Sequence, residues 1–158
     1  MITFHSTSEE MTLSLGERLA KVLRPGMVVS LDGDLGCGKT VISRGVARGL
    51  GITEAVTSPT FTDAQEYRYG GGYLYHLDMY RIPDENSALA FGIDEFIFNP
   101  NAITLVEWPE RIAALLQDDR RLRHIRFRHL SPEEREITFV DWSDEECAAL
   151  AGDSAEEK

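Results

Sequence analysis

The segment Gly33–Thr40, which reads Gly-Asp-Leu-Gly-Cys-Gly-Lys-Thr, matches the phosphate-binding pattern G-x-x-x-x-G-K-T. The apolar run Met27–Leu31 precedes it, and the helix-compatible run Val41–Leu50 follows it. In a strand–loop–helix setting, the glycines let successive backbone N–H groups turn toward a phosphate, and the helix N-terminus adds its partial positive charge. The flanking strand and helix argue against an incidental glycine-rich turn. The pattern therefore predicts an α/β protein that binds a nucleoside triphosphate.

The side chains at the end of this loop have specific predicted roles. Lys39 is expected to reach the β- and γ-phosphates, and the hydroxyl of Thr40 is expected to bind Mg²⁺. The rest of the loop is expected to contribute backbone N–H groups to the phosphates. The residues predicted to surround the nucleotide phosphates are Gly33, Asp34, Leu35, Gly36, Cys37, Gly38, Lys39 and Thr40.

Length and composition restrict the possible classes of protein. A chain of 158 residues predicts a single domain, here residues 1–142, followed by an acidic tail at 143–158 that is mobile or forms a short helix at Asp144–Leu150. The net charge of −11 argues against a protein that coats nucleic acid by itself. The two cysteines form no metal or redox pattern, and no signal peptide or membrane-length apolar run is present. These features predict a cytoplasmic protein that does not contact a membrane.

Periodicity predicts a small parallel α/β core of the P-loop NTPase type with antiparallel strands and helices around it. Ser6, Thr7 or Ser8 is expected to cap a first helix that ends before Pro25-Gly26. The other expected elements are an edge strand at Ile2–His5, hairpins at Thr62–Tyr69 with Tyr73–Tyr80 and at His124–Leu130 with Glu136–Val140, a short helix at Asp84–Phe91, and a central strand at Ala102–Val106.

Hydrolysis requires a carboxylate for Mg²⁺ and a group that orients water, both beside the phosphate loop. Glu107 ends the buried strand Ala102–Val106 and resembles a Walker B position, although a carboxylate leaving the core is the simpler alternative. Every second side chain of a strand lies on the same face, so Asp78 shares a face with Leu74 and His76. On that face Asp78 either lines a site or faces water. We expect His76 to orient the Asp78 carboxylate.

The order and spacing of five motifs resemble the TsaE family of small bacterial ATPases. That family is required to make N6-threonylcarbamoyladenosine on tRNAs that read codons beginning with adenine. The resemblance extends over about residues 15 to 111, and the C-terminal hairpin and tail lie outside it. The motifs are Gly33–Thr40, Ser58–Thr62, His76–Arg81, Gly92–Glu95 and Val106–Glu110.

This resemblance implies a set of catalytic and metal-binding roles. Thr40 would bind Mg²⁺ directly, and Glu107 would complete the metal site directly or through water. Asp78 would lie near the metal and the γ-phosphate, where it would hold water or the metal. Thr60 would act as a switch element that senses the γ-phosphate. ATP and Mg²⁺ are therefore the implied cofactors.

The resemblance also implies contacts around the nucleotide, with two departures from the family. Glu9 and Arg135 would lie beside the base, and Trp108 would lie next to the site or pack in the core. The family often has threonine or serine where this chain has Val41, which leaves only a backbone N–H for the α-phosphate. Asp63-Ala64 stands where the family usually continues with apolar residues.

The implied partners resemble the TsaB–TsaD pair, which would carry out the transfer to tRNA while hydrolysis here resets the complex. Contact with tRNA would then be indirect. A small-molecule kinase, with Arg81 as the best lid arginine, and a nucleotide-sensing scaffold are the alternatives.

Five arginines form either a tRNA or partner patch or, as we favour, the outer face of a strand whose Ile125 and Phe127 point inward. They are Arg120, Arg121, Arg123, Arg126 and Arg128.

Overall fold

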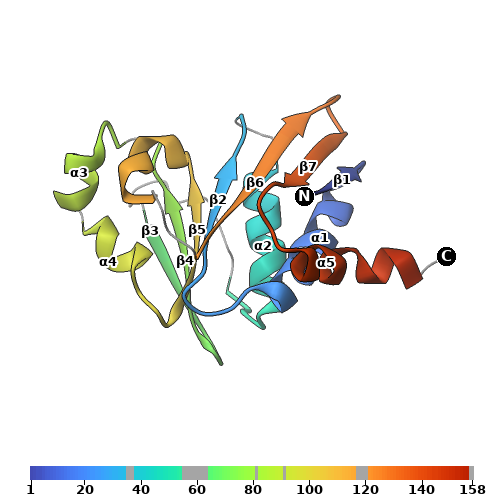
Figure 1. Cartoon of the computed structure of the whole chain (residues 1–158), viewed down its shortest axis with the longest axis horizontal. Helices are drawn as coiled ribbons and strands as arrows, with labels where there is room; N and C mark the ends of the chain where they lie inside the picture. Colours follow the sequence, from blue (N-terminus) through green and yellow to red (C-terminus); the bar gives the residue numbers. More distant parts are fainter. Residues whose placement is uncertain (35–37, 55–63, 81, 91, 117–120, 157–158) are drawn as a thin grey trace.

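The computed structural model describes residues 1–34, 38–54, 64–80, 82–90, 92–116 and 121–156. Within these ranges, strands and helices alternate along the first half of the chain, and a hairpin and a helix close it (Figure 1). The elements are β1 (Ile2–Ser6), α1 (Glu9–Val22), β2 (Val28–Asp32), α2 (Lys39–Gly49), β3 (Ala64–Tyr69), β4 (Gly72–Asp78), α3 (Glu85–Ala90), α4 (Ile93–Ile97), β5 (Ala102–Glu107), the 3₁₀ segment η1 (Pro109–Leu116), β6 (Leu122–His129), β7 (Arg135–Phe139) and α5 (Asp144–Glu156).

The described strands form one mixed sheet in the order β1-β7-β6-β2-β5-β4-β3. Strand β2 pairs in parallel with β5 and β6, and β5 pairs in parallel with β4. The antiparallel strands β3 and β7 extend this parallel core, and β1 pairs antiparallel with β7 at the far edge. The predicted α/β class is confirmed, with a parallel core and antiparallel additions.

Two apolar clusters cover opposite faces of the sheet because the side chains of a strand alternate between its faces. Leu74 and Leu105 belong to the cluster under α1, α2 and α5. Leu77 and Val106 belong to the cluster under α3, α4 and η1. In Figure 1 the first group of helices lies beside the β6–β7–β1 half of the sheet, and α3 and α4 lie toward β3 and β4. Central strands are therefore buried on both faces, as the apolar run at β5 predicted.

Helices α1 and α2 approach each other closely because glycine lies at their crossing. A Cβ on Gly45 would come within 2.4 Å of the Leu13 carbonyl oxygen, and one on Gly16 would come within 2.5 Å of the Ile42 carbonyl oxygen. Both obstacles are backbone atoms, which cannot move aside as a flexible side chain would. This packing fixes α2, and with it the phosphate-binding segment, against α1.

We expect Gly45→Ala to lower the free energy of unfolding by about 1–3 kcal/mol, because the added methyl group must push the two helix backbones apart. Gly152→Ala is the matched control: Gly152 also lies in a helix, but a Cβ added there would have no other atom within 4 Å. The control should be neutral or stabilising, since alanine is the better helix former. Urea unfolding of both variants measures the difference, and equal stabilities would contradict the packing argument.

The acidic C-terminal segment contributes a helix that packs on the domain. Glu146 and Ser143 form a capping box: the Ser143 N–H donates to Glu146 Oε1 at 2.8 Å, and the Glu146 N–H donates to Ser143 Oγ at 3.1 Å. Arg123 Nε of β6 also donates to Glu146 Oε1, at 3.0 Å. Leu150 is fully buried one turn further along. These contacts connect α5 to the sheet.

We expect Glu146→Gln to destabilise the protein by about 1–3 kcal/mol at neutral pH, because buried donors lose their charged acceptor. Burial alone would raise the pKa of the Glu146 carboxyl, but hydrogen bonds from Arg123 and Ser143 outweigh it and lower that pKa. The stabilisation is therefore complete above the ordinary carboxyl pKa of about 4.3 and disappears as the pH falls through the lowered value.

Urea unfolding of wild type and Glu146→Gln at neutral and at strongly acidic pH measures this dependence. The difference between the two proteins should shrink at the acidic pH. Glu145→Gln serves as the control because Glu145 is an exposed acid in the same turn. A pH-independent difference would show that shape, not charge, accounts for the effect.

The arginine-rich strand follows the alternation that we favoured. Ile125 and Phe127 of β6 are buried, whereas Arg126 and Arg128 are exposed. Arg123 forms an ion pair with Glu146. Arg120 lies outside the described residues.

The segments after the predicted short helix differ most from expectation. Helix α4 and the 3₁₀ segment η1 were not predicted, because each is short and its apolar residues complete a face of the sheet rather than form a long periodic stripe. Among the described residues, no helix combines the length and the apolar character needed to cross a bilayer.

Candidate active site

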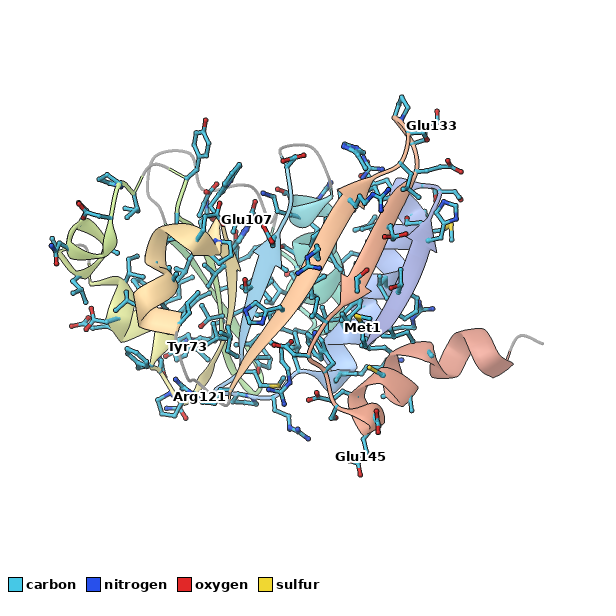
Figure 2. The ribbon with its side chains drawn as sticks, turned by 45° about the horizontal axis from the view of Figure 1, so that its top comes forward. Met1, Tyr73, Glu107, Arg121, Glu133 and Glu145 are labelled. Atoms are coloured by element: carbon cyan, nitrogen blue, oxygen red, sulfur yellow. The ribbon has the colours of Figure 1, made fainter. Side chains whose placement is uncertain are left out.

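The carboxyl ends of three neighbouring parallel strands meet at one edge of the sheet. Glu107 of β5 is paired in register with Asp78 of β4 on one side and with Leu31 of β2 on the other. Figure 2 shows Glu107 at the end of the sheet where β2 runs into the next segment, with Tyr73 at the opposite end. Ligands of open α/β sheets bind outside the carboxyl ends of the strands. Both predicted carboxylates therefore lie at the edge where the phosphate-binding segment begins.

Gly38 and Lys39 form the start of α2, the first helix after the central strand β2. Gly38 caps the helix with φ +105°, a left-handed conformation that favours glycine. Lys39 is 4 % exposed, and its Nζ donates a 2.7 Å hydrogen bond to the Gly33 carbonyl oxygen. The ammonium group of Lys39 therefore contacts the residue at which the phosphate-binding segment begins.

Trp108 covers this ammonium group. Lys39 Nζ lies 4.3 Å from the centroid of the Trp108 ring, which is a cation–π contact. The Tyr80 ring packs against the same indole, with centroids 4.9 Å apart. Trp108 has φ +58°, the only positive φ of a residue other than glycine in the described part of the chain. Trp108 also packs against the apolar cluster under α3, α4 and η1, so the structure is compatible with both roles that we left open for it.

Asp78 lies half-buried at the end of β4, and its Oδ1 accepts a 3.0 Å hydrogen bond from the Tyr80 N–H. Burial raises the pKa of the Asp78 carboxyl, and the neighbouring Glu107 charge adds to that increase. The Tyr80 hydrogen bond and the positive charge of Lys39 act in the opposite direction. Asp78 is therefore partly shielded from water and lies close enough to Glu107 and Lys39 for their charges to act on it.

His76 does not orient Asp78, contrary to our expectation. Its Nε2 is hydrogen-bonded to Oε2 of Glu107, and both side chains are buried, with 1 % and 6 % exposed. The reason is geometric: His76 is paired with Leu105, so Glu107 lies on the same face two residues along the neighbouring strand. The alternation of β4 revealed that His76 faces the site, but only the strand pairing identifies its partner.

Arg135 at the start of β7 lies against the phosphate-binding segment. A Cβ on Gly38 would lie 3.2 Å from Arg135 Cδ and 3.9 Å from Thr12 Cγ2 of α1. The structure therefore brings Arg135 to the loop. Glu9, in contrast, is largely exposed in the first turn of α1 and forms an ion pair with Arg44 of α2 at 3.2 Å.

Some of the remaining predicted site residues lie within the described ranges, and others lie outside them. Thr40 and Val41 follow Lys39 in the first turn of α2 and are half-buried, and Asp34 is exposed. Leu35, Gly36 and Cys37 of the loop lie outside the described residues, and so does Thr60 with the rest of its motif. Arg81 also lies outside them.

The arrangement brings together one ammonium group and two carboxylates beside a helix N-terminus. Among the described residues, no group of three or more His, Cys, Asp or Glu side chains is arranged to hold a metal ion by itself. Mg²⁺ bound with a nucleotide does not need such a cage, since it usually takes one or two protein carboxylates together with phosphate oxygens and water. The donors present therefore fit a magnesium–nucleotide complex.

Fold and site together define an α/β protein with a G-x-x-x-x-G-K-T segment and paired carboxylates at adjacent strand ends. The family model described as "Threonylcarbamoyl adenosine biosynthesis protein TsaE" matches residues 6–137. The chain therefore belongs to the TsaE family.

Individual relatives agree with this assignment. A protein of Bacillus subtilis named tRNA threonylcarbamoyladenosine biosynthesis protein TsaE is 41 % identical over 139 residues, which is 88 % of this chain and 85 % of the relative. A Streptomyces coelicolor protein of the same name is 38 % identical, over 87 % of this chain and 98 % of its own length. The crystal structure of Bacillus subtilis YdiB superposes with a TM-score of 0.77 at 32 % identity, and the match covers 99 % of this chain and 96 % of that one.

Proposed function

We propose that this protein binds ATP with Mg²⁺ and hydrolyses it slowly, as a subunit of the machinery that makes N6-threonylcarbamoyladenosine on tRNA. The observation that carries the proposal is the convergence of Lys39, Asp78 and Glu107 at one sheet edge. Membership of the TsaE family supports the pathway, because relatives of this family are named for that tRNA modification.

The binding step follows from the charges at the loop. Lys39 would exchange its bond to the Gly33 carbonyl for the β- and γ-phosphates, which are stronger, charged acceptors. The backbone N–H groups at the start of α2 and the helix dipole would add to this attraction. Trp108, stacked on the ammonium group, would keep water away from it.

The hydrolytic step requires a metal and an oriented water molecule. Thr40, Glu107 and Asp78 are the residues that would hold Mg²⁺, which would supply charge neutralisation at the phosphates. Partial burial raises the pKa of the Asp78 carboxyl, and Asp78 or Glu107 would hold the attacking water.

The sequence offers phosphate-binding and metal-binding groups but no obvious arginine that would reach the γ-phosphate from within the chain. Arg135 lies against Gly38 at the start of α2, and the role that we propose for it is a contact with the base. Hydrolysis by the isolated chain is therefore expected to be slow, and a partner surface is expected to accelerate it.

The partners proposed are proteins resembling TsaB and TsaD, which would contact tRNA while this chain acts on it only indirectly. The absence of a metal or redox pattern in its two cysteines fits work in the reduced cytoplasm.

The test is to measure threonylcarbamoyladenosine in tRNA from cells depleted of this protein. The modification should fall, and it should return with the wild-type gene but not with a Lys39→Ala gene. Unchanged modification after depletion would reject the pathway. Release of phosphate with no acceptor present, against transfer to a panel of metabolites, separates this ATPase from a small-molecule kinase.

A further inference from the structure

A histidine at position 76 is unusual for its surroundings. Strand β4 lies inside the sheet between β3 and β5, and the neighbours of His76 along the strand, Tyr75 and Leu77, are buried apolar residues. His76 itself is fully buried. A buried imidazole costs free energy unless its polar atoms are satisfied, so an aliphatic residue would stabilise this strand more simply. Such exceptions to local patterning are typical of functional sites.

The hydrogen bonding of His76 is one-sided. Nε2 contacts Glu107 Oε2, whereas Nδ1 is buried and has no hydrogen-bond partner among the residues that the structure describes. An ionised carboxylate only accepts hydrogen bonds, so Nε2 carries the proton that is shared with Glu107. Within the described part of the chain, the imidazole therefore has a single hydrogen bond, and it is with the carboxylate at the end of β5.

We propose that His76 is a positioning residue for Glu107: its Nε2–H holds Oε2 and so fixes the carboxylate, whose other oxygen, Oε1, would be the one available to Mg²⁺. This inference rests on the proposed function, in which Glu107 helps to hold Mg²⁺. Residues that hydrogen-bond a metal ligand from behind fix its orientation and basicity, and their loss typically lowers metal affinity about 10–100-fold.

The position of the pair explains why a hydrogen bond is needed here. Glu107 is the last residue of β5, and the strained backbone of Trp108 follows it directly. The side chain of Asp78 lies on the neighbouring strand in register with Glu107. Two carboxylates at adjacent positions repel each other when both are ionised. A fixed donor behind Glu107 keeps its carboxylate in place against that repulsion before any metal binds.

The test measures how strongly Mg²⁺ increases nucleotide affinity, using a non-hydrolysable ATP analogue as the probe. Calorimetry in excess Mg²⁺ and in excess EDTA gives two affinities, and their ratio reports the contribution of the metal. His76→Leu keeps the approximate volume but removes the donor, so the ratio should fall at least about tenfold. His76→Gln places an amide N–H near the position of Nε2, so it should keep the ratio within about threefold of wild type.

His76→Asn provides the second comparison, because its shorter amide reaches only the Nδ1 position and should behave like His76→Leu. If His76→Leu does not fold, the comparison of His76→Gln with His76→Asn still tests the role of the Nε2 donor. Ser30→Ala is the control for a buried polar group elsewhere in the sheet. Ser30 lies on β2, two strands from β4, it is 1 % exposed, and its hydroxyl has no partner among the described residues. That control should leave the ratio unchanged, whatever it does to the melting temperature.

The inference is overturned if folded His76→Leu and His76→Asn keep the wild-type ratio, or if His76→Gln loses as much as they do. A wild-type protein that binds the analogue equally well with and without Mg²⁺ would reject the metal site, and with it this role of His76. A wild-type protein that binds no analogue at all would reject the proposed function itself.

Discussion

Replacing Lys39 with alanine is expected to weaken ATP binding about 100-fold or more, which corresponds to roughly 3 kcal/mol. Lys39 is 4 % exposed, and its ammonium group contacts both the Gly33 carbonyl oxygen and the Trp108 ring, so it meets a phosphate with little competing water. Removing it leaves the triphosphate charge without its nearest counter-charge in a desolvated site. Calorimetric titration with ATP and Mg²⁺ measures the loss.

Lys21→Ala is the matched control for this prediction. Lys21 lies in the last turn of α1 and is exposed, so its removal changes the net charge by the same amount away from the loop. It should leave ATP affinity within about threefold of wild type, because exposed charges are screened. Equal effects of the two substitutions would show that overall charge, not a built phosphate site, determines binding.

Glu107→Gln is expected to lower the rate of ATP hydrolysis about 100-fold or more, while nucleotide affinity without Mg²⁺ stays close to wild type. The carboxylate accepts hydrogen bonds or a metal at both oxygens, and it already accepts the His76 Nε2–H at Oε2. An amide has only one accepting oxygen, so it cannot satisfy both His76 and the metal. Steady-state phosphate release, measured alone and with partner proteins, gives the rate.

The control for Glu107 lies three residues further along the chain. Glu110 is exposed in the first turn of η1, and Glu110→Gln removes the same charge without touching the site. It should hydrolyse ATP at the wild-type rate. If Glu107→Gln also retained the wild-type rate, Glu107 would be a carboxylate that merely ends a strand. A Glu107→Ala variant that still binds ATP and still supports tRNA modification would instead favour the nucleotide-sensing scaffold.

Much of the fold was predictable from local sequence signals. The apolar run at β5 predicted a strand buried on both faces, and Pro25-Gly26 correctly predicted the end of α1, which the structure places at Val22. Both hairpins were predicted from their turn residues and alternation. What could not be predicted was the order of the strands, because pairing between distant segments depends on packing that no local pattern encodes.

The site was predictable as a set of residues, but the contacts between them were not. Asp78 and Glu107 are far apart in the sequence, and only the parallel pairing of β4 with β5 brings them into register. The same pairing places His76 beside Glu107, so His76 hydrogen-bonds the Glu107 carboxylate instead of the Asp78 carboxylate. The stacking of Trp108 on Lys39 depends on a positive φ, which a residue with a bulky side chain rarely adopts and a sequence pattern does not reveal.

The most direct test of the central claim is a crystal structure of this chain with a non-hydrolysable ATP analogue and Mg²⁺. The account predicts that the β- and γ-phosphates lie within hydrogen-bonding distance of Lys39 Nζ, and that the ion lies between the Thr40 hydroxyl and the Glu107 carboxylate. A nucleotide bound elsewhere on the protein, or a Glu107 side chain turned away from the ion, would contradict it.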